Sequence, residues 1–181
     1  MTRVNGYAAE SERTYFTAQP SAEARKAFAA MMEARRIAFG LIRPGRSCSE
    51  LDGRVNDFLR KEGYGSEVQR LHRTGHGFGL GNHEAPWIAE GSQDVLAENM
   101  VISIEPGIYL DGVGGFRHSD TVLLTNGTHE VLTTKYPTEL DGLVLRSWKP
   151  VTRFKGWLVR RALRLAHKAR RTRPAPNRRG V

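Results

Sequence analysis

The chain has 181 residues, a formal charge of +9 and a single cysteine, Cys48. This length is typical of one domain with a sizeable hydrophobic core and leaves little room for a second full domain. One cysteine excludes an intrachain disulfide and a thiolate metal cluster, and it fits a reducing compartment. No apolar run approaches the roughly 18 residues of a membrane span, and the first residues lack the apolar core of a signal peptide. We therefore expect a cytoplasmic protein.

Charge is distributed unevenly along the chain. Residues 1–143 contain 15 Lys and Arg against 19 Asp and Glu, whereas residues 144–181 contain 13 basic residues and no acid. We predict a mildly acidic domain over 1–143 and a basic tail over 144–181. The tail has the spacing of an amphipathic helix over 154–171, and its Arg- and Pro-rich end is typical of disorder. It is either a solvated appendage or a weak contact for anionic lipid or nucleic acid.

The first half of the chain predicts an extended segment and two helices. Residues 4–17 alternate so that Glu10, Glu12 and Thr14 share one face. A long helix then runs from Ser21, its N-cap, to about residue 42, and a second helix begins at Ser47 or Ser49. The apolar stripes of these helices consist of Phe28, Met31, Met32, Ala38 and Phe39 in the first and Leu51, Val55, Phe58 and Leu59 in the second.

Shorter segments follow and predict strands over 101–104, 107–110, 121–125 and 130–133, with a hairpin turn at Asn126-Gly127. Two helices followed by a mostly antiparallel sheet make an α+β fold. Residues 4–17 would leave an unpaired sheet edge, which favours dimerisation or aggregation.

The stretch over 72–120 carries the residues that could perform chemistry. It contains His72-Arg-Thr-Gly-His76-Gly, then His83-Glu84, then Glu105-Pro-Gly, and finally Gly-Gly-Phe-Arg117-His-Ser-Asp. Imidazoles, a carboxylate and an arginine among glycines are what a hydrolytic site needs if loops and strand ends converge. The glycines at 75, 77, 79 and 81 are either turn residues or allow close approach to a ligand.

In order and spacing, these motifs and the segment over 6–14 resemble the methionine aminopeptidase, prolidase and creatinase superfamily, and most closely its Xaa-Pro peptidase branch. The resemblance covers residues 4 to about 140 and corresponds to the C-terminal half of the family's "pita-bread" fold. It implies a partial pita-bread domain, incomplete at its N-terminus, with a curved and mostly antiparallel sheet. It also implies pairing with a missing N-terminal half or a homodimer.

The resemblance also implies a site. In the metal-dependent members two Asp, one His and two Glu hold two divalent ions, and His76 and Glu105 match two of these ligands. Glu105 would also accept a proton from the nucleophile, and His83 would contact the substrate and stabilise the tetrahedral intermediate. Glu10 stands in place of an Asp, Ser119 replaces the last Glu, and the first Asp would fall before Met1.

Other residues near these motifs leave two roles open. Arg117 either binds a substrate carboxylate or pairs with a neighbouring acid, and His72 either contacts the substrate or is structural. Glu12 either adds a second acid to the site on the face of Glu10 or is an exposed residue that pairs with Arg13 or Arg3. His118 should point away from Ser119 and form a hydrogen-bonded pair with Asp120.

Three functions follow from these residues. The first is a peptidase cleaving near peptide N-termini, including before proline, with one Mn, Co or Zn ion held by His76, Glu105 and Glu10. The second is a metal-free hydrolase resembling creatinase, with a histidine as general base. The third is a peptide-binding module without catalysis.

Overall fold

The computed structural model describes residues 2–145, 154, 157–159 and 161, and the chain divides into two compact units, residues 1–144 and 145–181. Most of the amphipathic helix predicted over 154–171, and all of 172–181, lie outside the described residues. In the part that is described, no helix is both long and apolar enough to cross a membrane.

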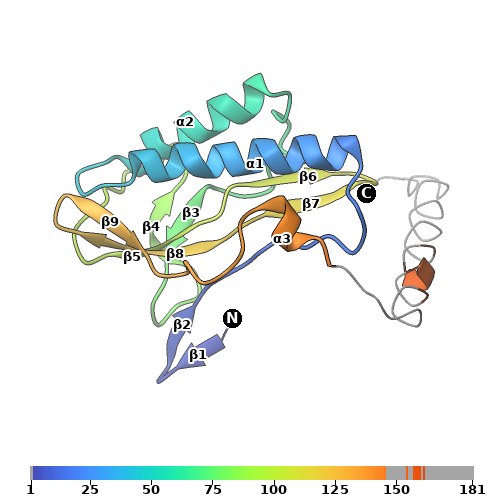
Figure 1. Ribbon diagram of the computed structural model, residues 1–181. Coiled ribbons are helices and arrows are strands. Elements are labelled where there is room, and N and C mark those ends of the chain that lie inside the picture. Colours follow the sequence, from blue (N-terminus) through green and yellow to red (C-terminus); the bar gives the residue numbers. More distant parts are fainter. Residues whose placement is uncertain (1, 146–153, 155–156, 160, 162–181) are drawn as a thin grey trace, which may run out of the picture. The chain divides into compact units, whose positions relative to one another are not determined.

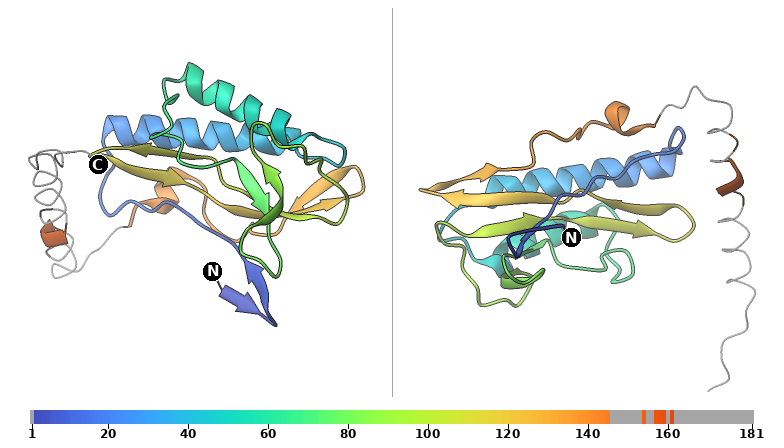
Figure 2. Two further views of the ribbon diagram at one scale, coloured as in Figure 1. Left: turned by 180° about the vertical axis from the view of Figure 1, so that it is seen from behind. Right: turned by 90° about the horizontal axis from the view of Figure 1, so that it is seen from below.

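Two helices cover one face of the sheet in the first unit (Figures 1 and 2). Helix α1 (Ala22–Leu41) begins where the Ser21 hydroxyl accepts the Ala24 N–H at 3.1 Å. Helix α2 (Cys48–Lys61) is capped in the same way by Ser47, which accepts the Glu50 N–H at 3.3 Å. Both caps agree with the sequence prediction, because a serine oxygen satisfies a backbone donor that the first turn leaves unpaired.

The main sheet has five strands in the order β4-β3-β5-β8-β9, and every neighbouring pair is antiparallel. These strands are β3 (Gly75–Gly77), β4 (Glu84–Ile88), β5 (Val101–Ile104), β8 (Asp120–Thr125) and β9 (Thr128–Val131). Strands β6 (Gly107–Leu110) and β7 (Gly114–Arg117) form a separate hairpin. The α+β prediction is confirmed.

Several strand bounds were predicted from the sequence and others were not. The bounds of β5 and β6 agree with the prediction, and β8 begins one residue earlier than predicted. The last strand was placed two residues too late, because Asn126-Gly127 forms a tight turn after which pairing resumes at once, with Thr125 opposite Thr128. Strands β3, β4 and β7 lack the alternating pattern and were not predicted.

The glycines of β3 are neither turn residues nor a surface for a ligand. A Cβ added to Gly75 would lie 2.1 Å from the Ser103 carbonyl oxygen, and one added to Gly77 would lie 2.2 Å from the Ala85 carbonyl oxygen. The neighbouring strands therefore approach β3 more closely than any side chain permits. Glycine at these positions brings β3 into the sheet.

The N-terminal segment differs from its prediction. Instead of one extended edge, β1 (Thr2–Val4) and β2 (Tyr7–Ala9) form a hairpin around Asn5-Gly6, both at positive φ as a tight hairpin turn requires. The segment then makes isolated bridges, Glu12 to Ser119 and Phe16 to Val144. The prediction of an unpaired edge over 4–17 is wrong, and the edges of the five-stranded sheet are β4 and β9.

The hydrophobic core lies between the helices and the sheet, and a short helix α3 (Leu140–Leu143) adds Leu143 to it. Burial of these side chains supplies the main favourable term for folding. The fully buried members include Ala27, Met31, Ala34, Ala38, Leu51, Ile88, Ile102, Ile104, Ile108, Val122 and Leu124.

Candidate active and metal-binding site

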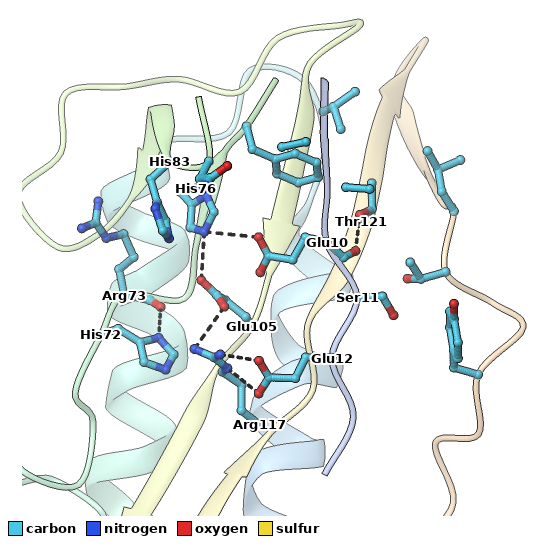
Figure 3. Close-up of a pocket in the computed structure, with 18 of the residues that line it drawn as sticks. Glu10, Ser11, Glu12, His72, Arg73, His76, His83, Glu105, Arg117 and Thr121 are labelled. Atoms are coloured by element: carbon cyan, nitrogen blue, oxygen red, sulfur yellow. Dashed lines mark hydrogen bonds and ion pairs between the residues drawn. The ribbon is translucent and has the colours of Figure 1, made fainter. Parts of the chain in front are cut away.

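A cleft of about 1240 Å³ collects most of the residues singled out from the sequence (Figure 3). Its walls come from the N-terminal segment, from β3 and the loop after it, from the ends of β5 and β7, and from the chain after β9. The candidate residues in its lining are Glu10, Glu12, His72, His76, His83, Glu105 and Arg117.

His76, at the centre of β3, is held in one tautomer. Its Nδ1 lies 2.9 Å from the Gly77 carbonyl oxygen, and since a carbonyl can only accept, Nδ1 carries the proton. The opposite nitrogen, Nε2, faces two carboxylates, at 3.1 Å from Glu105 Oε1 and 3.7 Å from Glu10 Oε2. Burial lowers the pKa of His76, but Glu105, the Gly77 carbonyl and Glu10 outweigh it and raise the pKa overall.

Glu105 follows β5 directly and is fixed by its own backbone. Its N–H donates to the Thr74 carbonyl at 2.8 Å, which joins the end of β5 to the residue before β3. Burial alone would raise the pKa of Glu105, yet the close contact with His76 Nε2 and the charge of Arg117 lower it overall. The second carboxylate oxygen lies 3.4 Å from an Arg117 nitrogen. The buried acid is therefore ionised and has one oxygen directed at His76.

Glu10 reaches the same point from the N-terminal segment. Its Oε1 accepts the Ser119 hydroxyl at 2.6 Å, and burial is the largest cause of its raised pKa. Ser119 is fully buried, so a serine hydroxyl stands where the family resemblance placed a carboxylate ligand. The hydroxyl supports Glu10 and leaves its other oxygen free to face His76.

The three side chains fit a cation. One ligand atom from each of Glu10, His76 and Glu105 lies within 4.8 Å of the others. His76 Nε2 and Glu10 Oε2 are both buried and make no hydrogen bond with any described residue. A neutral imidazole nitrogen and two carboxylate oxygens are all acceptors, and acceptors that converge out of water need a cation or a proton between them. Such a mixed oxygen and imidazole set suits Mn, Co or Zn.

Arg117 is already engaged by acids. Its guanidinium binds Glu12 through both carboxylate oxygens, with Nε 2.9 Å from Oε1, and this pairing is the largest cause of its raised pKa. Of the two roles left open, the structure shows the pairing with a neighbouring acid, and contact with a substrate carboxylate stays a prediction. The predicted surface partners of Glu12 are wrong, since Arg13 binds Asp120 and Arg3 binds Asn82. Glu10 and Glu12 both line the cleft, in agreement with their predicted shared face, but the sequence carried no signal for the pairing of Glu12 with Arg117.

The two remaining histidines of the motif line the cleft in different ways. His83 is exposed, and its ring centroid lies 4.4 Å from that of His76. His72 uses both ring nitrogens, one with the Arg73 carbonyl at 2.9 Å and one with the Tyr109 hydroxyl at 2.8 Å. Figure 3 shows His72 below His83 on the same wall. His83 is thus the more available of the two for an incoming substrate.

His118 corrects one prediction. It is fully buried, and neither of its ring nitrogens has a hydrogen-bond partner among the described residues. Its ring packs edge-on against Phe28 at 5.4 Å, and burial followed by repulsion from Arg13 and Arg35 lowers its pKa to about 4. Asp120 binds the two arginines instead. The predicted His118–Asp120 hydrogen bond is absent, and His118 does not face the cleft.

Comparison with known proteins identifies the family. Residues 1–126 match the model of metallopeptidase family M24, and the chain belongs to this family. It is 40% identical over 120 residues to the "Probable dipeptidase PepE" of Mycobacterium tuberculosis, which covers 66% of this chain and 32% of that protein. It is 38% identical over 132 residues to the Xaa-Pro dipeptidase of Pyrococcus furiosus, covering 72% and 37%. The chain thus spans about a third of the length of these curated relatives.

Solved structures show the same fold. The Xaa-Pro dipeptidase of Bacillus anthracis superposes with a TM-score of 0.71 at 36% identity, covering 77% of this chain and 38% of the other. The prolidase of Pyrococcus furiosus gives 0.69 at 37% identity, covering 74% and 39%. The predicted family and the partial pita-bread fold are therefore confirmed.

Proposed function

We propose that this chain is a peptidase-like hydrolase of the Xaa-Pro type, which cleaves near the N-termini of peptides and holds one Mn, Co or Zn ion. The ligands are Glu10, His76 and Glu105. One observation carries this proposal: three buried acceptors, two of them without a partner, converge in the cleft of a family M24 domain.

Ser119 limits the site to a single ion in this proposal. Two metal ions need more carboxylate oxygens than these residues offer, and a neutral hydroxyl is a weak ligand for a hard cation. Ser119 also occupies one Glu10 oxygen by donating to it at 2.6 Å. Each residue therefore offers one ligand atom. These atoms are Oε2 of Glu10, Nε2 of His76 and the Glu105 oxygen that faces His76, Oε1.

Each side chain has a distinct task. A divalent ion, when bound, supplies a water of lowered pKa and polarises a carbonyl. Glu105, kept ionised by Arg117, accepts the proton of the attacking water. His83, exposed beside His76, donates a hydrogen bond to the substrate carbonyl and stabilises the negative charge that develops there. The Gly77 carbonyl keeps the His76 proton on Nδ1, away from the ligand position.

The test is hydrolysis of an Xaa-Pro dipeptide, such as Met-Pro, by the full chain. Turnover should vanish with EDTA, return with Mn, Co or Zn, and fall at least about 100-fold in Glu105→Gln, because this change removes both a metal ligand and the proton acceptor. Glu98→Gln, at an exposed position, is the control and should keep full activity. No turnover by the folded, metal-loaded chain would contradict the proposal.

A metal-free hydrolase remains the second candidate, and one distance favours it. His76 Nε2 and Glu105 Oε1 are 3.1 Å apart, a normal hydrogen-bond length, so a proton on Nε2 satisfies this pair without an ion. Turnover that resists EDTA and is lost in His83→Ala would establish this mechanism. Peptide binding without turnover under any of these conditions would instead establish the non-catalytic module. The homodimer, the lipid or nucleic acid contact of the tail and the cytoplasmic location stay predictions.

A further inference from the structure

Asp52 is a buried carboxylate outside the cleft, in the second turn of α2. It is 3% exposed and accepts four hydrogen bonds, two on each oxygen. Oδ1 accepts the Thr74 N–H at 2.9 Å and the Thr74 hydroxyl at 2.6 Å. Oδ2 accepts the Asn56 side-chain amide at 3.0 Å and the Glu90 N–H at 2.8 Å. Among the described ion pairs none involves Asp52, so hydrogen bonds alone offset the cost of burying it.

Thr74 connects this carboxylate to the candidate ligands. The N–H and the hydroxyl of Thr74 both donate to Asp52, while the Thr74 carbonyl accepts the N–H of Glu105 at 2.8 Å. Two residues later the chain reaches His76. The backbone of Thr74 is therefore hydrogen-bonded to α2 through its N–H and to the residue after β5 through its carbonyl. These bonds fix the position of His76, two residues later, relative to Glu105.

The other oxygen of Asp52 holds the neighbouring strand. Glu90 lies two residues beyond the end of β4, and within the β3–β4 pair Gly75 is opposite Ile88. One carboxylate thus binds the chain just before β3 and just after β4, where these antiparallel strands meet. Any tilt of β3 against β5, which would separate Nε2 from Oε1, strains the bonds to Asp52.

We propose that Asp52 is a positioning residue, which acts through Thr74 to set the separation between His76 and Glu105. The inference rests on the proposed function only in taking these two residues as ligands. Loss of a carboxylate that orients metal ligands through hydrogen bonds typically weakens metal affinity by about 10- to 100-fold. Asp52 acts in this way from α2, through Thr74.

The experiment compares four full-length variants by Co²⁺ titration, followed by visible absorption, and by amide hydrogen exchange of the metal-free chain. Asp52→Asn removes an acceptor with little change in shape. Thr74→Val removes only the hydroxyl, and Thr74→Ser restores it. Asp94→Asn is the matched control, because Asp94 accepts the Trp87 N–H of β4 at 2.6 Å but does not bind β3 or β5.

We expect Asp52→Asn to bind Co²⁺ about 10-fold more weakly and Thr74→Val a few-fold more weakly, with Thr74→Ser within about two-fold of the parent. Asp94→Asn should lose stability yet keep its Co²⁺ affinity. Unchanged affinity in both Asp52→Asn and Thr74→Val, or an equal loss in Asp94→Asn, would overturn the inference.

Hydrogen exchange separates this inference from the proposed function. If the parent chain binds no Co²⁺, the metal proposal fails, but the amides of His76 and Glu105 still report on their positioning. In Thr74→Val and Asp52→Asn these two amides should lose more protection than the amides of α1 do. Uniform loss across the chain would show a merely structural role and overturn the inference on its own. Thr74→Val keeps the test available if Asp52→Asn does not fold.

Discussion

The candidate residues on the two walls of the cleft are held in place by different kinds of contact. On the β3–β5 wall, His76 and Glu105 are fixed by backbone hydrogen bonds and by strands packed too closely to admit a Cβ at Gly75. On the N-terminal wall the backbone of Glu12 also pairs with that of Ser119, but the carboxylates of Glu10 and Glu12 are held by the side chains of Ser119 and Arg117. Backbone contacts tolerate little change, whereas side-chain contacts can be altered one at a time. The first wall should thus be rigid and the second adjustable.

The largest effect should come from Gly75→Ala on the rigid wall. The added Cβ would meet the Ser103 carbonyl oxygen at 2.1 Å, so β3 and β5 must separate. We expect a loss of more than about 4 kcal/mol in the free energy of unfolding, a range reached only when a substitution cannot be accommodated. Gly40→Ala in α1, where nothing lies within 4 Å, should instead gain up to about 1 kcal/mol in a urea titration. Equal effects of the two changes would contradict the conclusion that the β3–β5 wall is rigid.

Asp120→Asn tests the buried ion pairs that hold the N-terminal wall in place. Asp120 is fully buried and binds Arg13 at 2.5 Å and Arg35 at 2.7 Å. Its neutralisation leaves Arg13, whose side chain is 3% exposed, without its counter-ion, and should cost about 3–5 kcal/mol. Urea unfolding measures this loss, with Glu33→Gln, in an exposed pair on α1, as a control that changes little. A loss as small as that of the control would show that the buried pair does not anchor the segment.

His118→Leu should change the response to acid. The pKa of His118 is about 4 in the folded chain, below the roughly 6.5 of an unfolded histidine, so on acidification the unfolded state binds the proton first. Stability is therefore lost as pH falls from about 6.5 to about 4, and His118 has no such effect above that window. Between about pH 7.5 and 4.5, the parent should lose about 2 kcal/mol more than the Leu variant. Parallel losses in urea titrations at the two pH values would contradict the assigned pKa.

Glu12→Gln should have the smallest effect. The Glu12 side chain is 45% exposed and that of Arg117 is 29% exposed, so water screens their attraction. We expect a loss below about 1 kcal/mol in the free energy of unfolding, as is typical of exposed pairs. A loss comparable to that of Gly75→Ala would mean that both walls are equally rigid.

The sequence predicted the helices well, and it predicted that His76 and Glu105 would lie close together. Serine caps and apolar stripes are local signals, and Ser21 and Ser47 mark where the helices begin. His76 and Glu105 meet because His76 lies in β3, Glu105 follows β5, and these two strands are neighbours in the sheet. The helices could be predicted because their signals lie within a few residues of one another, and the His76–Glu105 pair because it belongs to a recognisable motif.

Other contacts could not be read from the sequence because they join distant segments. Strand β3 has no alternation, since its glycines serve the close approach of β4 and β5. The Arg117–Glu12 pair spans 105 residues. Asp120 was assigned to its neighbour His118, whereas its partners come from α1 and the N-terminal segment. Charge pairing across such separations depends on the folded geometry.

The most direct test of the proposed metal site is the Co²⁺ stoichiometry of the full chain. We predict one ion per chain with a low micromolar dissociation constant, lost in His76→Ala and Glu105→Gln and weakened in Glu10→Gln. No binding, or binding that both His76→Ala and Glu105→Gln retain, would contradict the claim that these three side chains form a metal site.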